Sequence, residues 1–315
     1  MQDTIIDVLI IGGGPGGLTA GMYASRGGAN TVLYELGLPG GQIVTSSEIE
    51  NYPGYLEIKS GMELMEQWPE QAKKFGTDIR MGSVDRVEKK DNIFELTLDS
   101  KKVVQAKSVI LATGSVPKRA GFKGEDEFFG KGVSTCATCD GFFYKNQEVM
   151  TLGGGDTALE EAIFLSNICK KVYLVHRRDT FRAAPSTVAR VMKAENIEII
   201  YNAEIAEVYG DNTGMLGAKV RMRESQEVID YKLPVIFVFV GRNVLNAPII
   251  VDDKPICELN DAGEVVVDLK MRTSLAGLYA IGDVRIDAQK QVVCAAGDGA
   301  SAAVDAIEYV HALEG

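Results

Sequence analysis

The chain of 315 residues is 46% hydrophobic and 24% charged, and it carries a formal net charge of −11. Its length and composition predict a globular protein with a sizeable core and two domains. The negative charge argues against nucleic acid and anionic membrane surfaces as partners, because both attract clustered Lys and Arg.

The chain opens on a short β-branched run, Ile5 to Ile11, which predicts a strand buried on both faces. Asp3, Asp7 and the lack of a basic region distinguish this segment from a secretory leader. No apolar run reaches the roughly 18 residues that a membrane-spanning helix needs. Five cysteines in a chain of this length do not make a secreted disulfide scaffold, so we expect a cytoplasmic protein.

A glycine-rich turn follows this strand and leads into a helical stretch, a strand from Thr31 to Tyr34, and an acid, Glu35. This order of elements is typical of a dinucleotide-binding fold. Gly12 permits the tight turn, Gly14 lets the backbone approach a pyrophosphate, and Gly17 lets the helix pack against the strand. Glu35 is placed to accept hydrogen bonds from a ribose diol. The candidate contacts of the turn are Gly12, Gly14, Pro15 and Gly17, and the alternative is a turn without a ligand.

Two turn-rich segments and a candidate helix come next. Residues 40–42 and 50–54 could lie against a ligand, but their composition alone assigns them no role. Met62 to Phe75 has the spacing of one helix that packs on the core. The remaining elements of this part are, in order, a hairpin from Val84 to Leu98, a buried strand from Ser108 to Ala112 that ends at Thr113 and Gly114, and a linker at residues 117–119.

A pair of cysteines, Cys136 and Cys139, is followed directly by Asp140. Such a pair can close a small disulfide, accept two electrons and pass them on by thiolate exchange. Half of a zinc site and two inert buried cysteines are the alternatives. Zinc needs four ligands, whereas the other cysteines stand alone and the only histidines are His176 and His311. The pattern therefore favours a redox pair and no metal.

A second dinucleotide fold starts near Gly121. A strand from Glu148 to Leu152 leads into a glycine run that opens a helix, and Val172 to Val175 predicts the next strand. This is the same order of elements as at the start of the chain. The candidate contacts are Gly153, Gly155, Asp156 and Thr157.

The two folds differ where the ribose is expected. Gly14 and Glu35 are 21 residues apart, and so are Gly155 and His176. An acid at this position suits a free 2′-hydroxyl, whereas arginines suit a 2′-phosphate. The second fold therefore predicts NADPH rather than NADH, and the alternative is a solvated basic turn. The residues concerned are His176, Arg177, Arg178 and Arg182.

Two further apolar strands are expected, Val235 to Val240 and Leu278 to Ile281. The first runs into residues 241–243, a candidate return linker, and the second into the pair Gly282-Asp283. Strands of such folds meet a ligand at their carboxyl ends, where glycine allows a close approach. Residues 290–304 predict a closely packed helix whose N-terminus could face a ligand.

Two dinucleotide sites beside a dithiol form a consistent redox set. Nicotinamide gives up a hydride, a disulfide accepts two electrons, and a flavin can mediate between them. The site that ends in an acid would then hold FAD, and the site with arginines would hold NADPH. The residues alone do not prove the flavin.

These motifs together resemble those of the bacterial low-molecular-weight thioredoxin reductases. They are Cys-Ala-Thr-Cys-Asp-Gly-Phe-Phe from Cys136, the second glycine run followed by His-Arg-Arg-x-x-x-Arg, and Gly-Asp-Val near the end. The resemblance runs in order along the whole chain. It implies an α/β fold of two Rossmann-like domains, in which an NADPH domain (residues 117–243) with the redox-active disulfide is inserted into an FAD domain (residues 1–116 and 244–315).

The resemblance also implies a thioredoxin-disulfide reductase that works as a homodimer. Hydride would pass from NADPH to FAD, and the electrons then to the disulfide and to oxidised thioredoxin. By the resemblance, Cys139 faces the flavin, Cys136 attacks the partner's disulfide, and Asp140 donates and accepts the proton. The alternative for Asp140 is a helix cap. The candidate FAD contacts are Gly12, Gly14, Glu35, Gly40, Gly41, Gln42, Asn51, Thr113, Gly114, Gly282, Asp283, Gln291 and Val292.

Three positions depart from the family pattern, and the first is Gly16, where the family often has alanine. Lys131 and Lys290 stand where the family often has arginine, and a lysine does not reproduce the planar fork of a guanidinium. The departures concern docking of the partner at Lys131 and packing against the flavin at Lys290.

Two other functions stay open. One is a related NADPH-dependent flavin dithiol oxidase, or a reductase that acts on a small or a different protein disulfide. The oxidase would release peroxide during turnover without a protein partner. The other is a nucleotide-sensing flavoprotein without turnover, for which Cys136→Ser would be harmless.

Overall fold

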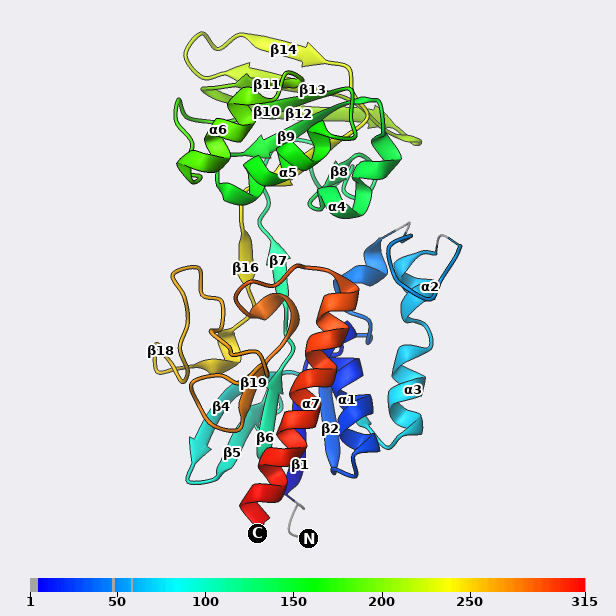
Figure 1. The fold of residues 1–315 in the computed structure, drawn as a ribbon, viewed down its shortest axis with the longest axis vertical. Helices are drawn as coiled ribbons and strands as arrows, with labels where there is room; N and C mark the ends of the chain where they lie inside the picture. The colour runs from blue at the N-terminus through cyan, green and yellow to red at the C-terminus, as the bar shows by residue number, and fades with distance from the viewer. Residues whose placement is uncertain (1–4, 47–48, 58, 315) are drawn as a thin grey trace. The chain divides into compact units, whose positions relative to one another are not determined.

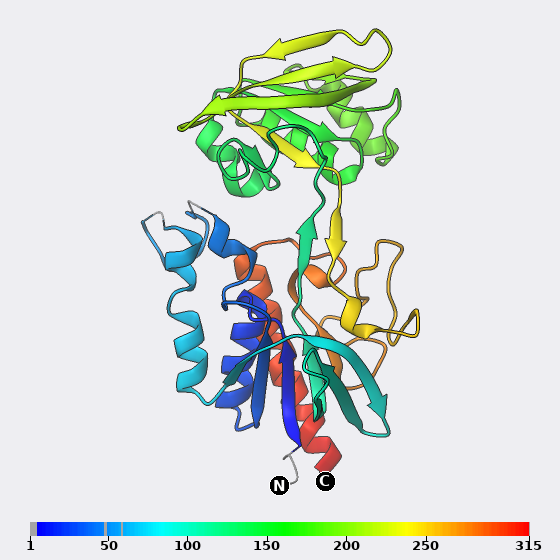
Figure 2. The same cartoon turned by 180° about the vertical axis from the view of Figure 1, so that it is seen from behind.

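The computed structural model describes residues 5–46, 49–57 and 59–314. It divides into two compact units (Figures 1 and 2). One consists of the chain up to Val116 together with the chain from Val244 onward, and the other extends from Pro117 to Asn243. These boundaries lie where the sequence analysis places the edges of the inserted domain.

A seven-stranded sheet forms the centre of the first unit, in the order β3-β2-β1-β6-β5-β4 with β19 also paired to β6. Strands β3, β2, β1, β6 and β19 are parallel, and β4 and β5 extend the sheet as an antiparallel hairpin. The strands are β1 (Ile6–Ile11), β2 (Thr31–Glu35), β3 (Asp78–Met81), β4 (Val84–Lys90), β5 (Ile93–Leu98), β6 (Val103–Leu111) and β19 (Leu278–Ala280).

Strand β1 is buried on both faces, as its β-branched run predicts. Leu9 and Ile11 belong to the core cluster on one face of the sheet, and Val8 and Ile10 to the cluster on the other. Its neighbours are β2 on one side and β6 on the other, so Val8 pairs with both strands. This central position places the glycine turn after β1 at the middle of the carboxyl edge.

Two helices from opposite ends of the chain, α1 (Pro15–Arg26) and α7 (Val292–Glu314), lie side by side on the sheet (Figure 1). Glycine at position 299 lets the two helices approach closely, since a Cβ added there would lie 2.2 Å from the carbonyl oxygen of Gly16. The smaller elements of this unit are η1 (Gln42–Thr45), α2 (Gly61–Met65), α3 (Trp68–Lys74), η3 (Ala247–Ile249), β17 (Ile250–Val251), β18 (Lys254–Pro255) and η4 (Gly282–Val284).

The second unit contains a five-stranded parallel sheet in the order β11-β10-β9-β15-β8. A three-stranded antiparallel sheet, β12-β13-β14, joins it (Figure 2). The elements are β8 (Val133–Ser134), α4 (Ala137–Asp140), η2 (Gly141–Tyr144), β9 (Glu148–Gly153), α5 (Asp156–Ser166), β10 (Lys171–Val175), α6 (Pro185–Lys193), β11 (Ile197–Ile200), β12 (Ala203–Asp211), β13 (Gly214–Met222), β14 (Val228–Tyr231) and β15 (Ile236–Phe239).

The chain passes between the units twice, and both linking segments are short strands. They are β7 (Ser115–Pro117) and β16 (Arg242–Val244), which pair with each other. The predicted linkers at residues 117–119 and 241–243 therefore overlap a two-stranded ribbon.

Three expectations differ from the structure. The single helix expected from Met62 to Phe75 is wrong, because α2 ends at Met65 and α3 begins at Trp68. Pro69 explains the break, since a proline lacks the N–H that would bond to the carbonyl of Met65 and its ring clashes there. The last helix begins at Val292 and ends at Glu314, so it extends ten residues beyond the expected end at residue 304. The three-stranded sheet of the second unit was not predicted.

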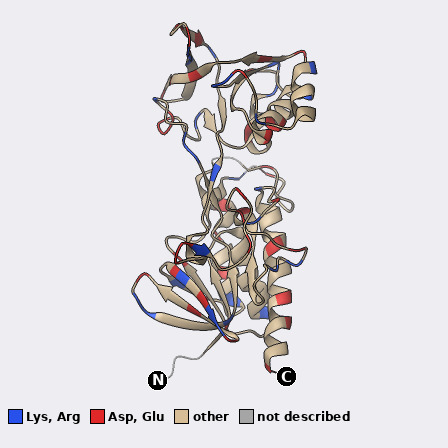
Figure 3. Ribbon diagram, turned by 90° about the vertical axis from the view of Figure 1, so that its left-hand side faces the viewer, with Lys and Arg blue, Asp and Glu red and all other residues tan. Residues whose placement is uncertain are grey.

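Charged residues of both signs are mixed over both units (Figure 3). Their ion pairs are mostly exposed, as for Lys73 and Glu70 on α3, whose Nζ and Oε1 atoms lie 2.8 Å apart. Such pairs contribute little to stability. Of the helices in the described ranges, none combines the length and apolar character that a bilayer crossing requires.

Candidate redox centre and nucleotide sites

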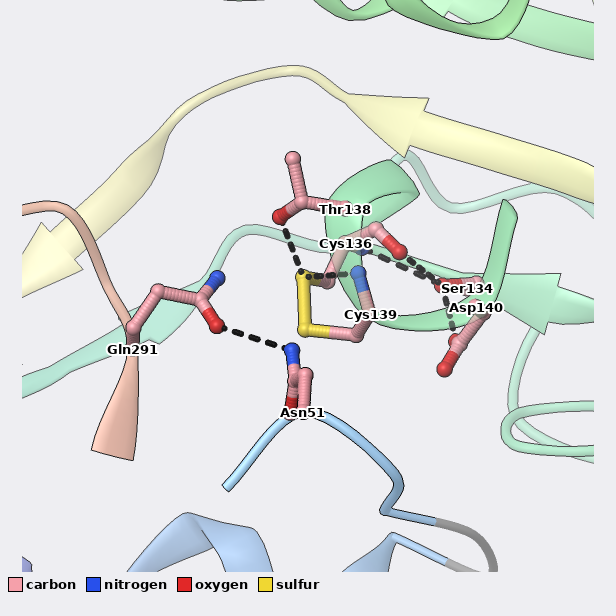
Figure 4. The surroundings of a disulfide bond; sticks show 7 residues. All are labelled: Asn51, Ser134, Cys136, Thr138, Cys139, Asp140 and Gln291. Atoms are coloured by element: carbon pink, nitrogen blue, oxygen red, sulfur yellow. Dashed lines mark hydrogen bonds between the residues drawn. A yellow bond between two sulfur atoms is a disulfide. The ribbon is translucent and has the colours of Figure 1, made fainter. Parts of the chain in front are cut away.

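The cysteine pair forms a disulfide at the carboxyl end of β8 (Figure 4). Cys136 has an extended backbone and precedes the short helix α4, which contains Cys139, and the two Cα atoms are 5.3 Å apart. Because β8 and β9 belong to one parallel sheet, the disulfide and the glycine run after β9 lie at the same edge. A zinc site is wrong for this pair, since a disulfide leaves no thiolates to bind the metal.

The sulfur of Cys136 has two hydrogen-bond donors nearby (Figure 4). The backbone N–H of Cys139 donates to it over 3.2 Å, and the hydroxyl of Thr138 lies 3.4 Å away. After reduction, both donors can stabilise a thiolate on Cys136, which is the state that attacks a disulfide. Thr138 was not among the predicted site residues, although its place between the cysteines was a signal.

The carboxylate of Asp140 accepts a hydrogen bond from Ser134, with Oγ and Oδ2 2.6 Å apart (Figure 4). Asp140 makes no side-chain capping bond to the 3-10 turn η2 that follows it, so the helix-cap alternative is wrong. Ser134 was also missed by sequence reasoning. A serine two residues before a cysteine is too common a pattern to signal a site.

The remaining buried cysteines differ from this pair. Cys169 and Cys257 are 6% and 7% exposed, and burial raises the pKa of each thiol to about 11. Both thiols are therefore protonated and unreactive near neutral pH. Within the described ranges, the structure holds no group of three or more His, Cys, Asp or Glu side chains that could bind a metal ion.

The glycine turn after β1 is held by close backbone contacts. Gly12 has a φ of +107°, and a Cβ there would lie 2.4 Å from the carbonyl oxygen of Ala112. A Cβ at Gly17 would lie 1.9 Å from the carbonyl oxygen of Gly12. Helix α1 then begins with Gly14 as its N-cap and has no side-chain cap, so its first N–H groups face the turn. Such a helix start suits the pyrophosphate of a dinucleotide.

Glu35 lies at the end of β2 beside this turn. One of its oxygens accepts the N–H of Gly13 over 2.6 Å, and the other accepts the N–H of Gly37 over 3.0 Å. The carboxylate is thereby fixed next to the turn. Thr113, after β6 at the same edge, has a buried Oγ1 without a hydrogen-bond partner. A buried polar atom of this kind fits a site for a polar ligand.

The other predicted FAD contacts of the first unit gather around the same edge. The N–H of Gly40 donates to the carbonyl of Gly13 over 2.8 Å, and the side chain of Gln42 donates to the carbonyl of Ser115. Asn51 donates to Gln291 over 3.2 Å, just before α7 begins at Val292 (Figure 4). Gly41 and Gly114 lie in loops of the same unit, and Gly282 and Asp283 are the first two residues of η4.

The second glycine run follows β9 and opens α5. A Cβ at Gly153 would lie 2.6 Å from the carbonyl oxygen of Phe239, whereas a Cβ at Gly155 would meet no atom within 4 Å. Gly155 thus borders open space, and α5 begins there with Asp156 and Thr157 and no side-chain cap. Its free N–H groups suit a second pyrophosphate.

The loop after β10 presents the predicted arginines. Arg177, Arg178 and Arg182 are exposed, whereas His176 is 6% exposed and its ring lies under Gly154. Its Nε2 lies 2.9 Å from the carbonyl of Thr180, and burial is the main cause that lowers its pKa. His176 therefore supports the loop from inside, and the exposed cations are the three arginines.

Backbone contacts tie this arginine loop to the glycine run. The N–H of Arg182 donates to the carbonyl of Gly154 over 2.8 Å, and the N–H of Ala184 donates to Asp156 over 2.7 Å. Arg223 donates to the carbonyl of Arg177 over 2.9 Å. The loop is therefore held beside the start of α5, where a bound ribose would lie.

The two lysines that replace family arginines are exposed. The Nζ of Lys290 lies 3.3 Å from the carbonyl of Ala288, in the turn before α7. The carbonyl of Lys131 accepts the N–H of Met215, which joins the segment before β8 to β13.

Comparisons with known proteins give one consistent result. The model of the pyridine nucleotide-disulphide oxidoreductase family matches residues 6–299. A thioredoxin reductase from Helicobacter pylori is 53% identical over 309 residues, which cover 98% of this chain and 99% of the relative. A thioredoxin reductase from Listeria monocytogenes is 39% identical over 321 residues, covering 99% and 96%. The crystal structure of a thioredoxin reductase from Streptococcus pyogenes is 35% identical and covers 98% and 99%, with a TM-score of 0.91.

Proposed function

The chain belongs to the pyridine nucleotide-disulphide oxidoreductase family, and we propose that within this family it reduces the disulfide of thioredoxin with NADPH. The observation that carries the proposal is the Cys136–Cys139 disulfide in a unit that also holds a glycine run and an arginine loop. A dithiol and a site for a phosphorylated nicotinamide are the two components that such a reaction needs.

The first unit is the proposed FAD domain. Its uncapped helix start at Gly14 would receive the pyrophosphate, and Glu35 would receive the ribose hydroxyls. The buried Oγ1 of Thr113 supports the presence of a polar ligand at this edge. The chemistry that bound FAD supplies is the relay of an electron pair from NADPH to the disulfide.

The second unit is the proposed NADPH domain. The backbone at Gly155 is open to an approaching pyrophosphate, and Arg177, Arg178 and Arg182 would bind the 2′-phosphate. We place His176 behind this site rather than in contact with the ligand, because its ring is buried under Gly154.

The two cysteines have different proposed roles. Cys136 is the sulfur that attacks the partner's disulfide, because the N–H of Cys139 and the hydroxyl of Thr138 stabilise its thiolate. Cys139 then closes the disulfide again and releases the reduced partner. Asp140 gives a proton to the leaving thiolate and takes one back in the reverse step.

We further propose that the protein is a homodimer in the cytoplasm. The resemblance to the thioredoxin reductases supports this proposal. Of the five cysteines, Cys136 and Cys139 form the disulfide, and Cys169, Cys257 and Cys294 are free thiols, which fits a reducing compartment.

The test is a turnover assay with oxidised thioredoxin. We expect reduction with NADPH, much slower reduction with NADH, and none above background with Cys136→Ser. Peroxide formed in proportion to NADPH without thioredoxin would instead identify a dithiol oxidase. Full activity of Cys136→Ser would exclude the proposed reaction.

A further inference from the structure

Ser134 is a buried polar residue at the redox centre that the cysteine motif does not include. It ends β8, two residues before Cys136, and is 7% exposed. Its Oγ lies 2.6 Å from Oδ2 of Asp140, 3.1 Å from the backbone nitrogen of Cys136 and 3.3 Å from the carbonyl oxygen of Cys136 (Figure 4). One hydroxyl thus contacts both the backbone that carries the attacking sulfur and the carboxyl group beside it.

The hydroxyl has one proton to donate and two lone pairs to accept with. The N–H of Cys136 occupies one lone pair in every state. The proton can point either to Asp140 or to the carbonyl of Cys136, but not to both at once. The direction of this single proton must therefore follow the protonation state of Asp140.

This arrangement provides hydrogen-bond partners for Asp140 in both its ionised and its protonated state. When Asp140 is ionised, Ser134 donates to the carboxylate. When Asp140 is protonated, its O–H can donate to the second lone pair of Ser134, and Ser134 then donates to the carbonyl of Cys136. None of the three donors is left without an acceptor in either state, so a proton can enter or leave Asp140 without breaking these hydrogen bonds.

We propose that Ser134 is a positioning residue that holds the carboxyl group of Asp140 in both protonation states during disulfide exchange. This inference rests on the proposed role of Asp140. In the exchange, the thiolate of Cys136 bonds to one sulfur of the partner's disulfide, and the other sulfur leaves as a thiolate that takes the proton of Asp140. Ser134 then turns its hydroxyl from the carbonyl of Cys136 to the carboxylate, and its own O–H bond stays intact.

The experiment is a double-mutant cycle with Ser134→Ala and Asp140→Asn in the full-length flavoprotein. Rates of disulfide reduction are measured with oxidised thioredoxin and with cystine, an alkyl disulfide whose leaving thiolate takes up a proton near neutral pH. We expect Ser134→Ala to slow exchange roughly tenfold, the effect of one lost bond to a charged group. The double variant should be no slower than Asp140→Asn alone, because Ser134 acts only through Asp140.

A second pair of variants separates the hydroxyl from packing. Ser134→Thr and Ser134→Val have the same shape and both suit a strand, so their difference reports the hydroxyl alone. Thr should restore most of the rate and Val should not. Ser166→Ala is the matched control, because it removes a hydroxyl that bonds only to the carbonyl of Ile163 at the end of α5.

Three results would overturn the inference. They are a Ser134→Val variant as fast as Ser134→Thr, effects of Ser134→Ala and Asp140→Asn that multiply, or an Asp140→Asn variant as fast as the wild type. A different result would contradict the proposed function, namely a wild-type protein that does not reduce thioredoxin. In that event the cycle is still decided with cystine.

Discussion

The two units use the same turn after the first strand but surround the expected ribose position with opposite charges. In the first unit Glu35 lies beside the turn and accepts two backbone N–H groups. In the second unit His176 occupies the equivalent place in the chain, but its ring is buried and three exposed arginines follow it. The comparison teaches that the same backbone turn can be combined with either charge, an acid after the second strand in the first unit and a loop of exposed arginines in the second.

The largest difference is expected in how much stability the protein loses when a glycine of each turn is replaced by alanine. Gly12→Ala forces a positive φ on alanine and brings its Cβ to 2.4 Å from a carbonyl oxygen. We expect a loss of roughly 3 kcal/mol of stability, seen as a lower melting temperature.

Gly155→Ala is the matched variant in the second turn. It has a φ of −101° and open space around the added methyl group. Its melting temperature should therefore stay near that of the wild type, while its KM for NADPH rises because the methyl group occupies room for the pyrophosphate. Equal melting temperatures for the two variants would contradict the difference between the turns.

The arginine loop should decide between the two nicotinamide cofactors. Arg177→Ala combined with Arg178→Ala removes guanidinium groups that would bind the 2′-phosphate. We expect KM for NADPH to rise roughly 10- to 100-fold and KM for NADH to stay unchanged. Arg190→Ala, an exposed arginine in the last turn of α6, is the control and should change neither value. A similar rise in KM for both cofactors would show that the arginine loop does not recognise the 2′-phosphate.

Replacing the acid of the first unit should weaken flavin binding and leave the binding of NADPH unchanged. Glu35→Ala removes the acceptor of the N–H groups of Gly13 and Gly37. We expect roughly tenfold weaker FAD binding to the apoprotein, measured by the quenching of flavin fluorescence, with unchanged KM for NADPH. A change in KM for NADPH without a change in FAD binding would reverse the assignment of the two units.

The smallest effect is expected at the buried thiols, one in each unit. Burial raises the pKa of Cys169 and of Cys257 from 9.0 to about 11. Between these two pH values, both thiols stay protonated in the folded protein but lose their protons in the unfolded chain. Their contribution to stability is therefore present below about pH 9 and is lost as the pH rises through about 11. Iodoacetamide at pH 8 should label neither residue in the folded protein, and fast labelling of either would contradict their burial.

The sequence predicted the parts of the molecule that depend on local pattern. The strand before each glycine turn, the turn itself and the residue after the second strand all lie close together in the chain, and their spacing carries the information. The resemblance of the cysteine and arginine motifs to one family extended this to the order of the domains.

The parts that the sequence did not predict depend on contacts between distant residues or on a single disruptive residue. The pairing of Asn51 with Gln291 joins segments far apart in the chain, and no local pattern indicates it. The break between α2 and α3 follows from Pro69, which the apolar spacing of the segment concealed. The burial of His176 follows from its packing under Gly154, a contact between residues 22 positions apart that the local basic motif does not indicate.

The most direct test of the whole account is an anaerobic titration with NADPH that follows the flavin absorbance. The wild type should take up about four electrons per chain and Cys139→Ser about two, because the flavin and the disulfide each hold one pair. Equal uptake by the two proteins would show that the disulfide at Cys136 and Cys139 does not receive electrons from NADPH, which contradicts the proposed function.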